Sequence, residues 1–193
     1  MRKLLIACVL ACLAPGAALA GGKYPDVADT STVDAAGGRV IQLSIVLNAP
    51  AKAVWDAFAD APTVRRWSAP LALIDLRQGG SMEESYSATA KAGDAQNIRN
   101  QIIAYVPGRT LVFRNTNAPT GLPGHEVYGQ VVSILQVDDL GGGKTRLTLS
   151  QTGYDKTAAF DSLYGFFHEE NAELMETLKA ALETPGGKLY AGR

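Results

Sequence analysis

The stretch TAAFDSLYGFFHEENAELMETLKAALE, residues 157–183, decides the fold because it predicts one long amphipathic helix near the C-terminus. Its large apolar residues recur at three- and four-residue spacing and therefore share one face of the helix. The members of this apolar stripe are Phe160, Leu163, Tyr164, Phe167, Leu174, Leu178 and Leu182. Pro185 and two glycines end the helix. Either the Asp155 carboxylate or the Thr157 hydroxyl is suited to cap its start.

Residues 71–152, which precede this helix, consist of strand-like stretches separated by turn residues such as Gly79-Gly80 and Pro107-Gly108. The six predicted strands are 71–77, 82–88, 98–105, 111–115, 127–137 and 146–152, with a loop over 116–124. Short turns between consecutive strands imply an antiparallel meander. One face of such a sheet has to be covered, and only the long helix is large enough to cover it.

A seventh strand and two short helices precede the meander. Alternating apolar residues predict a strand over 39–47, and Pro50 suits the first turn of a helix over 51–59, followed by a second helix over 62–67. The predicted fold class is therefore α+β. A curved, seven-stranded antiparallel sheet wraps around a long C-terminal helix, with two short helices after the first strand, which is a helix-grip fold.

This fold accounts for a single domain over residues 39–184. Residues 21–38 show little periodicity and are predicted to be a flexible leader, and residues 185–193 a C-terminal tail. The first twenty residues predict a secretory signal peptide, because a positive start, an apolar run over 4–13 and a small-residue pattern ending at Ala20 follow in that order. A membrane span needs about twenty apolar residues, so none is predicted here. We expect a secreted or periplasmic protein after cleavage near Ala20.

The composition excludes several kinds of partner. Cys8 and Cys12 are the only cysteines, and both lie in the predicted signal, so the mature chain would carry no disulfide and no thiolate metal site. Both cysteines also resemble the lipidation site of bacterial lipoproteins, which makes a lipid anchor at Cys12 or Cys8 the alternative to a soluble N-terminus. The net charge is −1 with no basic run, so no nucleic-acid partner is expected. Two histidines without matched carboxylates predict no metal site, and no cofactor is expected.

Three segments carry a resemblance to a known family: APAKAVWDAF at 49–58, VPGRTLVF at 106–113 and GKTRLTLSQTGY at 143–154. They resemble the START-like (SRPBCC) superfamily, which includes Bet v 1 allergens and polyketide cyclases. Within it they are most similar to the branch of the Hsp90 ATPase activator C-terminal domain. The resemblance implies the helix-grip fold with an apolar cavity between sheet and helix. An exported protein would meet neither Hsp90 nor ATP, so we expect no co-chaperone activity.

Strand parity and helix position select ten candidate residues for such a pocket. Alternate strand residues point to opposite faces, so Gln151 shares an inward face with Leu147 and Leu149, unless it lies in solvent at a frayed strand end. Glu84 and Tyr86 either point inward, where a buried carboxylate would have a raised pKa, or belong to a hydrated strand face. The candidates are Glu84, Tyr86, Phe113, His125, Tyr128, Gln151, Phe160, Tyr164, Phe167 and His168.

The histidines and the aromatic residues among these candidates each allow two interpretations. His168 lies at the edge of the apolar stripe, where it is either a partly buried surface residue or an acid–base group. His125 opens the strand predicted after the loop. Glu126 and Tyr128 are two residues apart in this strand and would point to the same face, so both enter the pocket or both face water. The helix aromatics either contact a ligand or fill the cavity themselves.

Two functions and a weaker third follow from these observations. The first is an exported binder or carrier of an apolar or amphipathic small molecule, since the sequence holds no nucleophile elbow and no Ser-His-Asp order. The second, implied by the resemblance, is a cyclase- or aromatase-like enzyme using Glu84, Tyr86 or His168 as acid or base. The third is a protein-interaction domain with a collapsed pocket.

Overall fold

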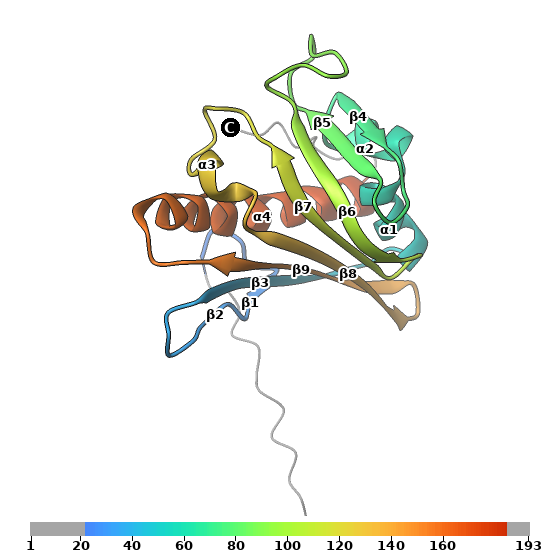
Figure 1. Ribbon diagram of the computed structural model, residues 1–193. Coiled ribbons are helices and arrows are strands. Elements are labelled where there is room, and N and C mark those ends of the chain that lie inside the picture. Colours follow the sequence, from blue (N-terminus) through green and yellow to red (C-terminus); the bar gives the residue numbers. More distant parts are fainter. Residues whose placement is uncertain (1–21, 185–193) are drawn as a thin grey trace, which may run out of the picture.

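The computed structural model describes residues 22–184, in which a curved antiparallel sheet holds one long helix on its concave side (Figure 1). The predicted signal peptide with Cys8 and Cys12, and the predicted tail, lie outside these residues. The long helix is α4, Ala158–Glu183, and its N-cap is Thr157, whose hydroxyl accepts a hydrogen bond from the Phe160 N–H at 3.4 Å. The residue that caps the start of α4 is therefore Thr157 and not Asp155.

The sheet contains all seven predicted strands in the predicted order. Its strand order is β1-β3-β9-β8-β7-β6-β5-β4, with every neighbouring pair antiparallel. The seven strands are β3 Arg39–Leu47, β4 Leu71–Ile74, β5 Ser81–Ser85, β6 Ile98–Val106, β7 Thr110–Asn117, β8 Val132–Gly141 and β9 Lys144–Tyr154. Helices α1, Ala51–Ala59, and α2, Ala61–Trp67, follow β3 as predicted.

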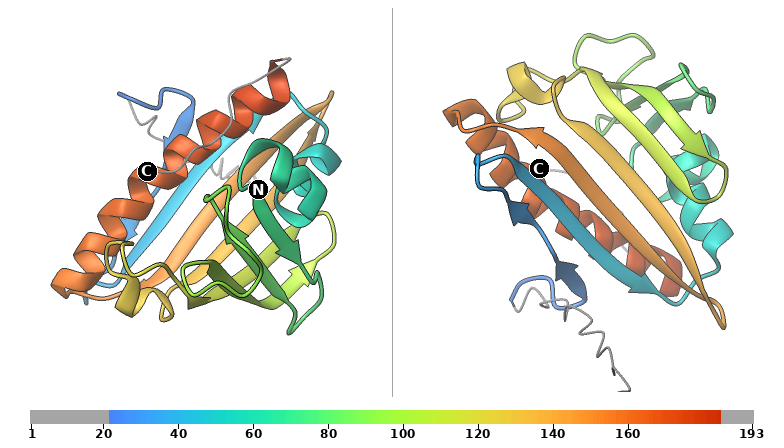
Figure 2. Two further views of the ribbon diagram at one scale, coloured as in Figure 1. Left: turned by 90° about the horizontal axis from the view of Figure 1, so that it is seen from above. Right: turned by 60° about the horizontal axis from the view of Figure 1, so that its bottom comes forward.

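The core lies between the concave face of the sheet and α4. Alternation in β3 buries Ile41, Leu43 and Ile45 on the inner side, as period-two alternation requires. From the helix, Leu163, Met175 and Leu178 are fully buried against them. Both views in Figure 2 show α4 running alongside the long strands β3 and β9, with α1 and α2 at one end of the sheet.

Two features of the fold differ from the sequence prediction. The leader contains two short strands, β1 Val27–Asp29 and β2 Thr32–Val33, which both pair with β3. Strands of three and two residues are too short for periodicity to reveal. Where a strand was predicted to start at residue 127, a short helical turn forms instead, α3 His125–Tyr128. In this turn Glu126 is exposed and Tyr128 is buried, so the shared parity expected of them is wrong.

Polar contacts attach the leader to the outer side of α4. The His168 ring nitrogen Nε2 lies 2.8 Å from the Asp29 carboxylate of β1. Burial acts to raise the pKa of Asp29, but hydrogen bonds from Ser31 and His168 outweigh it and hold that pKa below its usual range. Lys23 and the Tyr24 hydroxyl both bind the Glu169 carboxylate. These side chains hold the leader along α4, and the backbone pairing of β1 with β3 holds it on the sheet.

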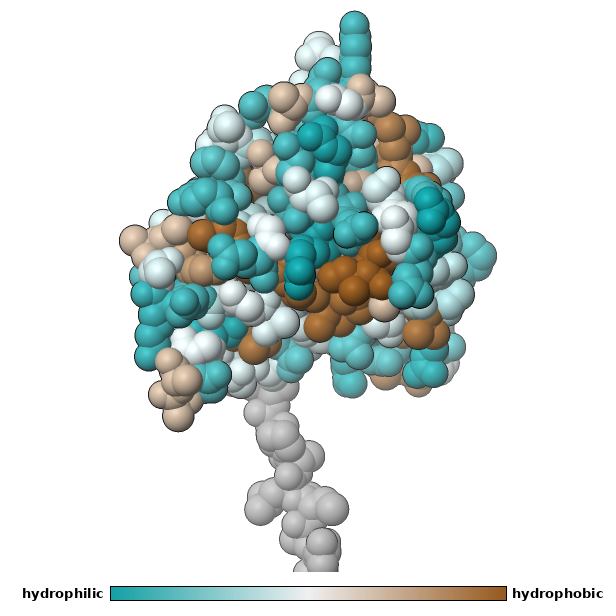
Figure 3. Space-filling model, in the orientation of Figure 1, coloured by the Kyte–Doolittle hydropathy of each residue, from teal (hydrophilic) through white to brown (hydrophobic). Residues whose placement is uncertain are grey.

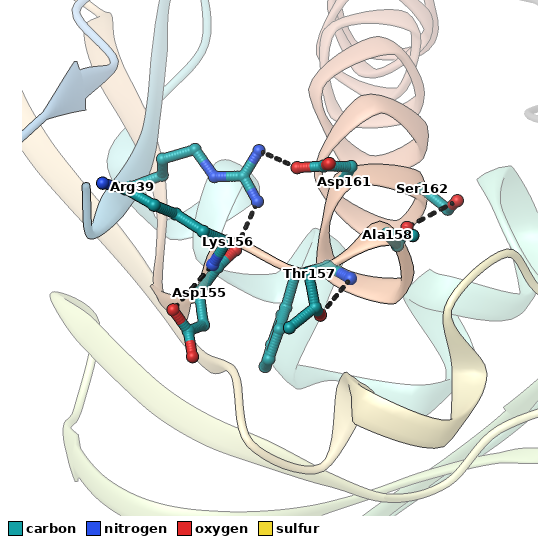
Figure 4. A network of polar contacts seen from close by, with 8 residues as sticks. Arg39, Asp155, Lys156, Thr157, Ala158, Asp161 and Ser162 are labelled. Carbon is teal, nitrogen blue, oxygen red and sulfur yellow. Dashed lines mark hydrogen bonds and ion pairs between the residues drawn. The ribbon is translucent and has the colours of Figure 1, made fainter.

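A second polar network joins β3 to the start of α4 (Figure 4). The Arg39 guanidinium pairs with the Asp161 carboxylate at 2.7 Å and donates a hydrogen bond to the Asp155 carbonyl at 2.6 Å. It also lies over the ring of Tyr164, 4.8 Å from the centroid. This network fixes the first turns of the helix on the sheet.

Replacing His168 with alanine should loosen β1 and lower the free energy of unfolding by about 1 kcal/mol, because one charge-assisted hydrogen bond is lost. The check is hydrogen exchange of the amides of residues 27–29 together with urea unfolding. His125→Ala is the matched control, since the His125 side chain is exposed and its ion-pair partner is the neighbouring Glu126. Equal exchange of these amides in both variants would show that His168 does not hold the leader.

Candidate ligand-binding cavity

A cavity of about 450 Å³ lies between the sheet, α4, the two short helices and the loop that precedes α3. Apolar side chains from every one of these elements line it, among them Val64 of α2, Leu111 of β7, Leu149 of β9 and Leu174 of α4. The volume falls within the range of about 300–1,000 Å³ that is typical of small-molecule sites. The curvature of the sheet creates this space, because α4 cannot contact all strands of a sheet that bends away from it.

Aromatic rings form much of the wall. Phe58 and Trp67 pack edge to face with their ring centroids 5.7 Å apart, and both line the cavity. The indole N–H of Trp67 donates to the Ala57 carbonyl at 2.8 Å, which fixes its ring. Elsewhere on the wall, the ring centroids of Tyr128 and Phe167 lie 4.7 Å apart. The remaining aromatic lining residues are Tyr86, Phe113 and Phe166.

Glu84 places a carboxyl group in this apolar cavity. It lies on β5, and among the described residues none donates a hydrogen bond to its carboxylate or forms an ion pair with it. Burial raises the pKa of Glu84 to about 7. Burial, and then the charge of Glu84, raise the pKa values of the Tyr86 and Tyr128 phenols above their usual range. A carboxyl group and two neutral phenols therefore line the same cavity, and Tyr86, which is 38% exposed, also reaches the surface.

Gln151 is held in a defined orientation on β9. Its side-chain amide donates to the Ser133 hydroxyl at 3.1 Å. Its carbonyl oxygen accepts from the Tyr154 hydroxyl at 2.9 Å and from the Asn171 amide at 3.1 Å. Gln151 is buried and not frayed, and it lines the cavity together with Ser133 and Asn171. Such a network keeps its members in place for a polar group of a ligand.

Six of the ten candidate residues line the cavity: Glu84, Tyr86, Phe113, Tyr128, Gln151 and Phe167. For Glu84, Tyr86 and Gln151 the parity argument gives the correct face, and for Phe167 the helix stripe does. Tyr128 reaches the cavity from the helical turn α3 and not from the predicted strand. Sequence reasoning missed these polar lining residues: Ser68, Asn100, Ser133, Ser150, Glu170 and Asn171. A signal for Glu170 and Asn171 was present, because they lie one turn after Phe167 and one turn before Leu174 on the same helix face.

The other four candidates lie elsewhere. His125 is exposed in α3 beside Glu126, because a helical turn replaces the strand that was to direct it inward. His168 points to the leader and binds Asp29. Tyr164 lies under Arg39, and Phe160 packs in the core against Tyr154. On α4 only residues between 166 and 174 line the cavity. Its first two turns pack against Tyr154 at the end of β9 and against Gly124 at the start of α3, so the stripe there does not reach the cavity.

Two further searches covered only the described residues. Within 22–184, no group of three or more His, Cys, Asp or Glu side chains is arranged to hold a metal ion. No helix in that part of the chain is long and apolar enough to cross a membrane.

Comparison with known proteins identifies the class of the chain. The sequence pattern of the family described as "Activator of Hsp90 ATPase homolog 1-like protein" matches residues 48–183, well over half of the chain. The chain therefore belongs to this family, as the three resembling segments predicted. None of the curated proteins compared with the chain matches it.

Solved structures share the fold at low identity. A protein from Staphylococcus saprophyticus has a TM-score of 0.60 at 18% identity, covering 79% of this chain and 97% of its own. The Aha1 dimer from Colwellia psychrerythraea has a TM-score of 0.59 at 15% identity, covering 77% and 98%. An HSP90 activator from Plasmodium falciparum has a TM-score of 0.54 at 13% identity, covering 76% and 97%. At such identities the likeness extends to the fold alone.

Proposed function

We propose that this protein binds or carries an apolar or amphipathic small molecule in the cavity between sheet and α4, outside the cytoplasm. The observation that carries the proposal is the cavity of about 450 Å³ with its largely apolar wall. Transfer of an apolar ligand from water to this cavity would contribute roughly 25 cal/mol of favourable free energy for each Å² of apolar surface that is buried. The predicted signal peptide is the basis for placing the protein outside the cytoplasm.

The open cavity favours this proposal over a protein-interaction domain with a collapsed pocket. A domain of that kind would fill its core and expose a large apolar patch. On the face seen in Figure 3, the widest hydrophobic area lies near the middle, smaller hydrophobic areas lie elsewhere, and hydrophilic residues separate them. The space inside the fold is thus the stronger candidate for a binding site.

An enzyme that uses acid–base chemistry is the second candidate, and the neighbouring Glu84, Tyr86 and Tyr128 favour it. A carboxyl group with a pKa of about 7 can both donate and accept a proton near neutral pH. Native mass spectrometry of protein purified from its own host distinguishes the two functions. A stoichiometric apolar molecule, released on denaturation, supports the carrier, and an empty protein directs attention to substrates that these three residues could protonate.

Leu174→Trp should weaken binding of the neutral fluorescent probe N-phenyl-1-naphthylamine at least tenfold, because the larger ring occupies the cavity that Leu174 lines. Fluorescence titration measures the affinity, and thermal unfolding verifies that the variant is folded. Leu140→Trp is the matched control, since Leu140 is 45% exposed on the β8–β9 hairpin. Should both variants bind the probe like the parent protein, the probe would not occupy the cavity and the proposal would lose its support.

A further inference from the structure

The charges on the cavity wall have one sign. Two glutamates line it, Glu84 and Glu170, and among the described lining residues none is lysine, arginine or histidine. The two carboxylates come from different elements, β5 and α4, which form different walls. Both act on the same phenol, because the charges of Glu84 and of Glu170 each raise the pKa of Tyr86. The two negative groups therefore belong to the wall of one cavity.

A ligand with a negative group would be repelled from this region. Two carboxylates without a cation in the wall disfavour an anion by Coulomb repulsion, which is strong where water is scarce. A purely apolar ligand would bury the Glu84 carboxylate without a partner, and burial of an unpaired charge is costly. A cationic group on the ligand removes this cost, since it supplies the partner that no described residue provides at Glu84.

The aromatic wall also suits a cation. Faces of tryptophan, tyrosine and phenylalanine rings attract ammonium groups, and groups of such rings recognise alkylated amines. Seven aromatic residues line the cavity: Phe58, Trp67, Tyr86, Phe113, Tyr128, Phe166 and Phe167. Apolar rings and two carboxylates in one cavity of about 450 Å³ match a ligand that has an apolar body and one positive end.

We propose that the cavity selects amphipathic amines, with the ammonium group of the ligand received by Glu84 and Glu170 and its apolar body held among the aromatic rings. This inference rests on the proposed function, because it names the class of ligand that the same cavity takes. It adds selectivity by charge, which a general binder of apolar molecules does not have.

Three probes with one ring system test the selectivity: 1-naphthylmethylamine, 1-naphthalenemethanol and 1-naphthoic acid. They carry a cationic, a neutral and an anionic group on the same apolar body. At pH 8, isothermal titration calorimetry should show the amine binding at least tenfold more tightly than the alcohol, and the acid binding most weakly. Glu84→Gln should lower the affinity for the amine to within about twofold of that for the alcohol, and Glu170→Gln should weaken the amine in the same direction.

The controls separate this inference from the proposed function. Glu126→Gln removes a glutamate that is exposed outside the cavity, so it should leave all three affinities unchanged. Equal affinity for amine and alcohol, with both lost in Leu174→Trp, would overturn the selectivity and leave the apolar binder in place. Absence of binding by all three probes and by N-phenyl-1-naphthylamine would overturn both. Loss of amine binding in Glu84→Gln with alcohol binding retained excludes misfolding and supports the inference.

Discussion

Replacing Glu84 with glutamine should make the protein more stable at pH 8 by up to about 3 kcal/mol. The physical reason is that burial raises the pKa of Glu84 from 4.5 to about 7, so that above pH 7 the folded protein holds a carboxylate that has lost its water. Glutamine has a similar shape and never ionises. The titratable groups on which the charge of Glu84 acts are Tyr86 and Tyr128, and Glu170 lines the same cavity; none of these groups offsets a negative charge.

The direction of the pH dependence follows from proton counting. Between pH 4.5 and about 7 the folded protein retains the proton of Glu84, whereas the unfolded chain has released it. The unfolded state therefore binds fewer protons, and the free energy of unfolding of the parent protein falls as the pH rises through this window. Below pH 4.5 both states are protonated, and the difference between parent and Glu84→Gln should be small.

Urea unfolding of both proteins at pH 4.5, 6, 7 and 8 measures this difference. The gain from Glu84→Gln should grow from pH 4.5 to 8, while Glu126→Gln, a change at an exposed glutamate, should show no such growth. A gain that does not depend on pH would mean that the carboxyl group titrates alike in folded and unfolded chains. The stabilised variant would in that case say nothing about burial of a charge.

Gly124→Ala should destabilise the protein by about 2–5 kcal/mol, through backbone strain and a steric clash together. Gly124 has φ +70°, a conformation that costs other residues free energy. A Cβ atom there would lie 2.5 Å from the carbonyl oxygen of Ala159 and 2.7 Å from the Cβ of Leu163, both on α4. Neither atom can move away easily, since one belongs to the helix backbone and Leu163 is fully buried.

Gly141→Ala separates the two causes. Gly141 has φ +77°, but nothing lies within 4 Å of the Cβ that alanine would add. It should therefore cost only the strain, about 1–2 kcal/mol, and the remainder of the Gly124→Ala effect measures the clash. Urea unfolding gives both values. Equal losses would show that the loop moves to accommodate the methyl group instead of pressing on α4.

Gly124→Ala should also affect the cavity. Pro119, Leu122 and Pro123 line it from the loop that Gly124 joins to α3. A shift of this loop should weaken binding of N-phenyl-1-naphthylamine, whereas Gly141→Ala, on a distant hairpin, should leave the affinity unchanged. The loop is thus expected to matter for binding as well as for stability.

The residue pattern predicted the fold well because the fold depends on local periodicity. The three- and four-residue spacing of 157–183 indicated α4, and alternation indicated β3 and β9, in agreement with the structure. Short turns between strands left an antiparallel meander as the simplest arrangement. Periodicity failed where elements are short, so β1 and β2 were missed and α3 was predicted as part of a strand.

The candidate site could be predicted only in part. Glu84, Gln151 and Phe167 were selected by parity or helix position, which depend on nearby residues in the chain. The two histidines could not be placed in this way. His168 lies one residue after Phe167, yet it binds a carboxylate 139 residues earlier in the sequence. No local pattern contains that contact.

The sequence by itself determined the order of the long strands and of helices α1, α2 and α4, and the family to which the chain belongs. Only the tertiary structure decided that a cavity remains open and that the leader lies along α4. It also decided that two glutamates line this cavity, while none of its described lining residues is a lysine, arginine or histidine. The reason is physical. Periodicity records the environment of each residue one element at a time, whereas a cavity depends on how far a curved sheet and a straight helix stand apart, which all their side chains set together.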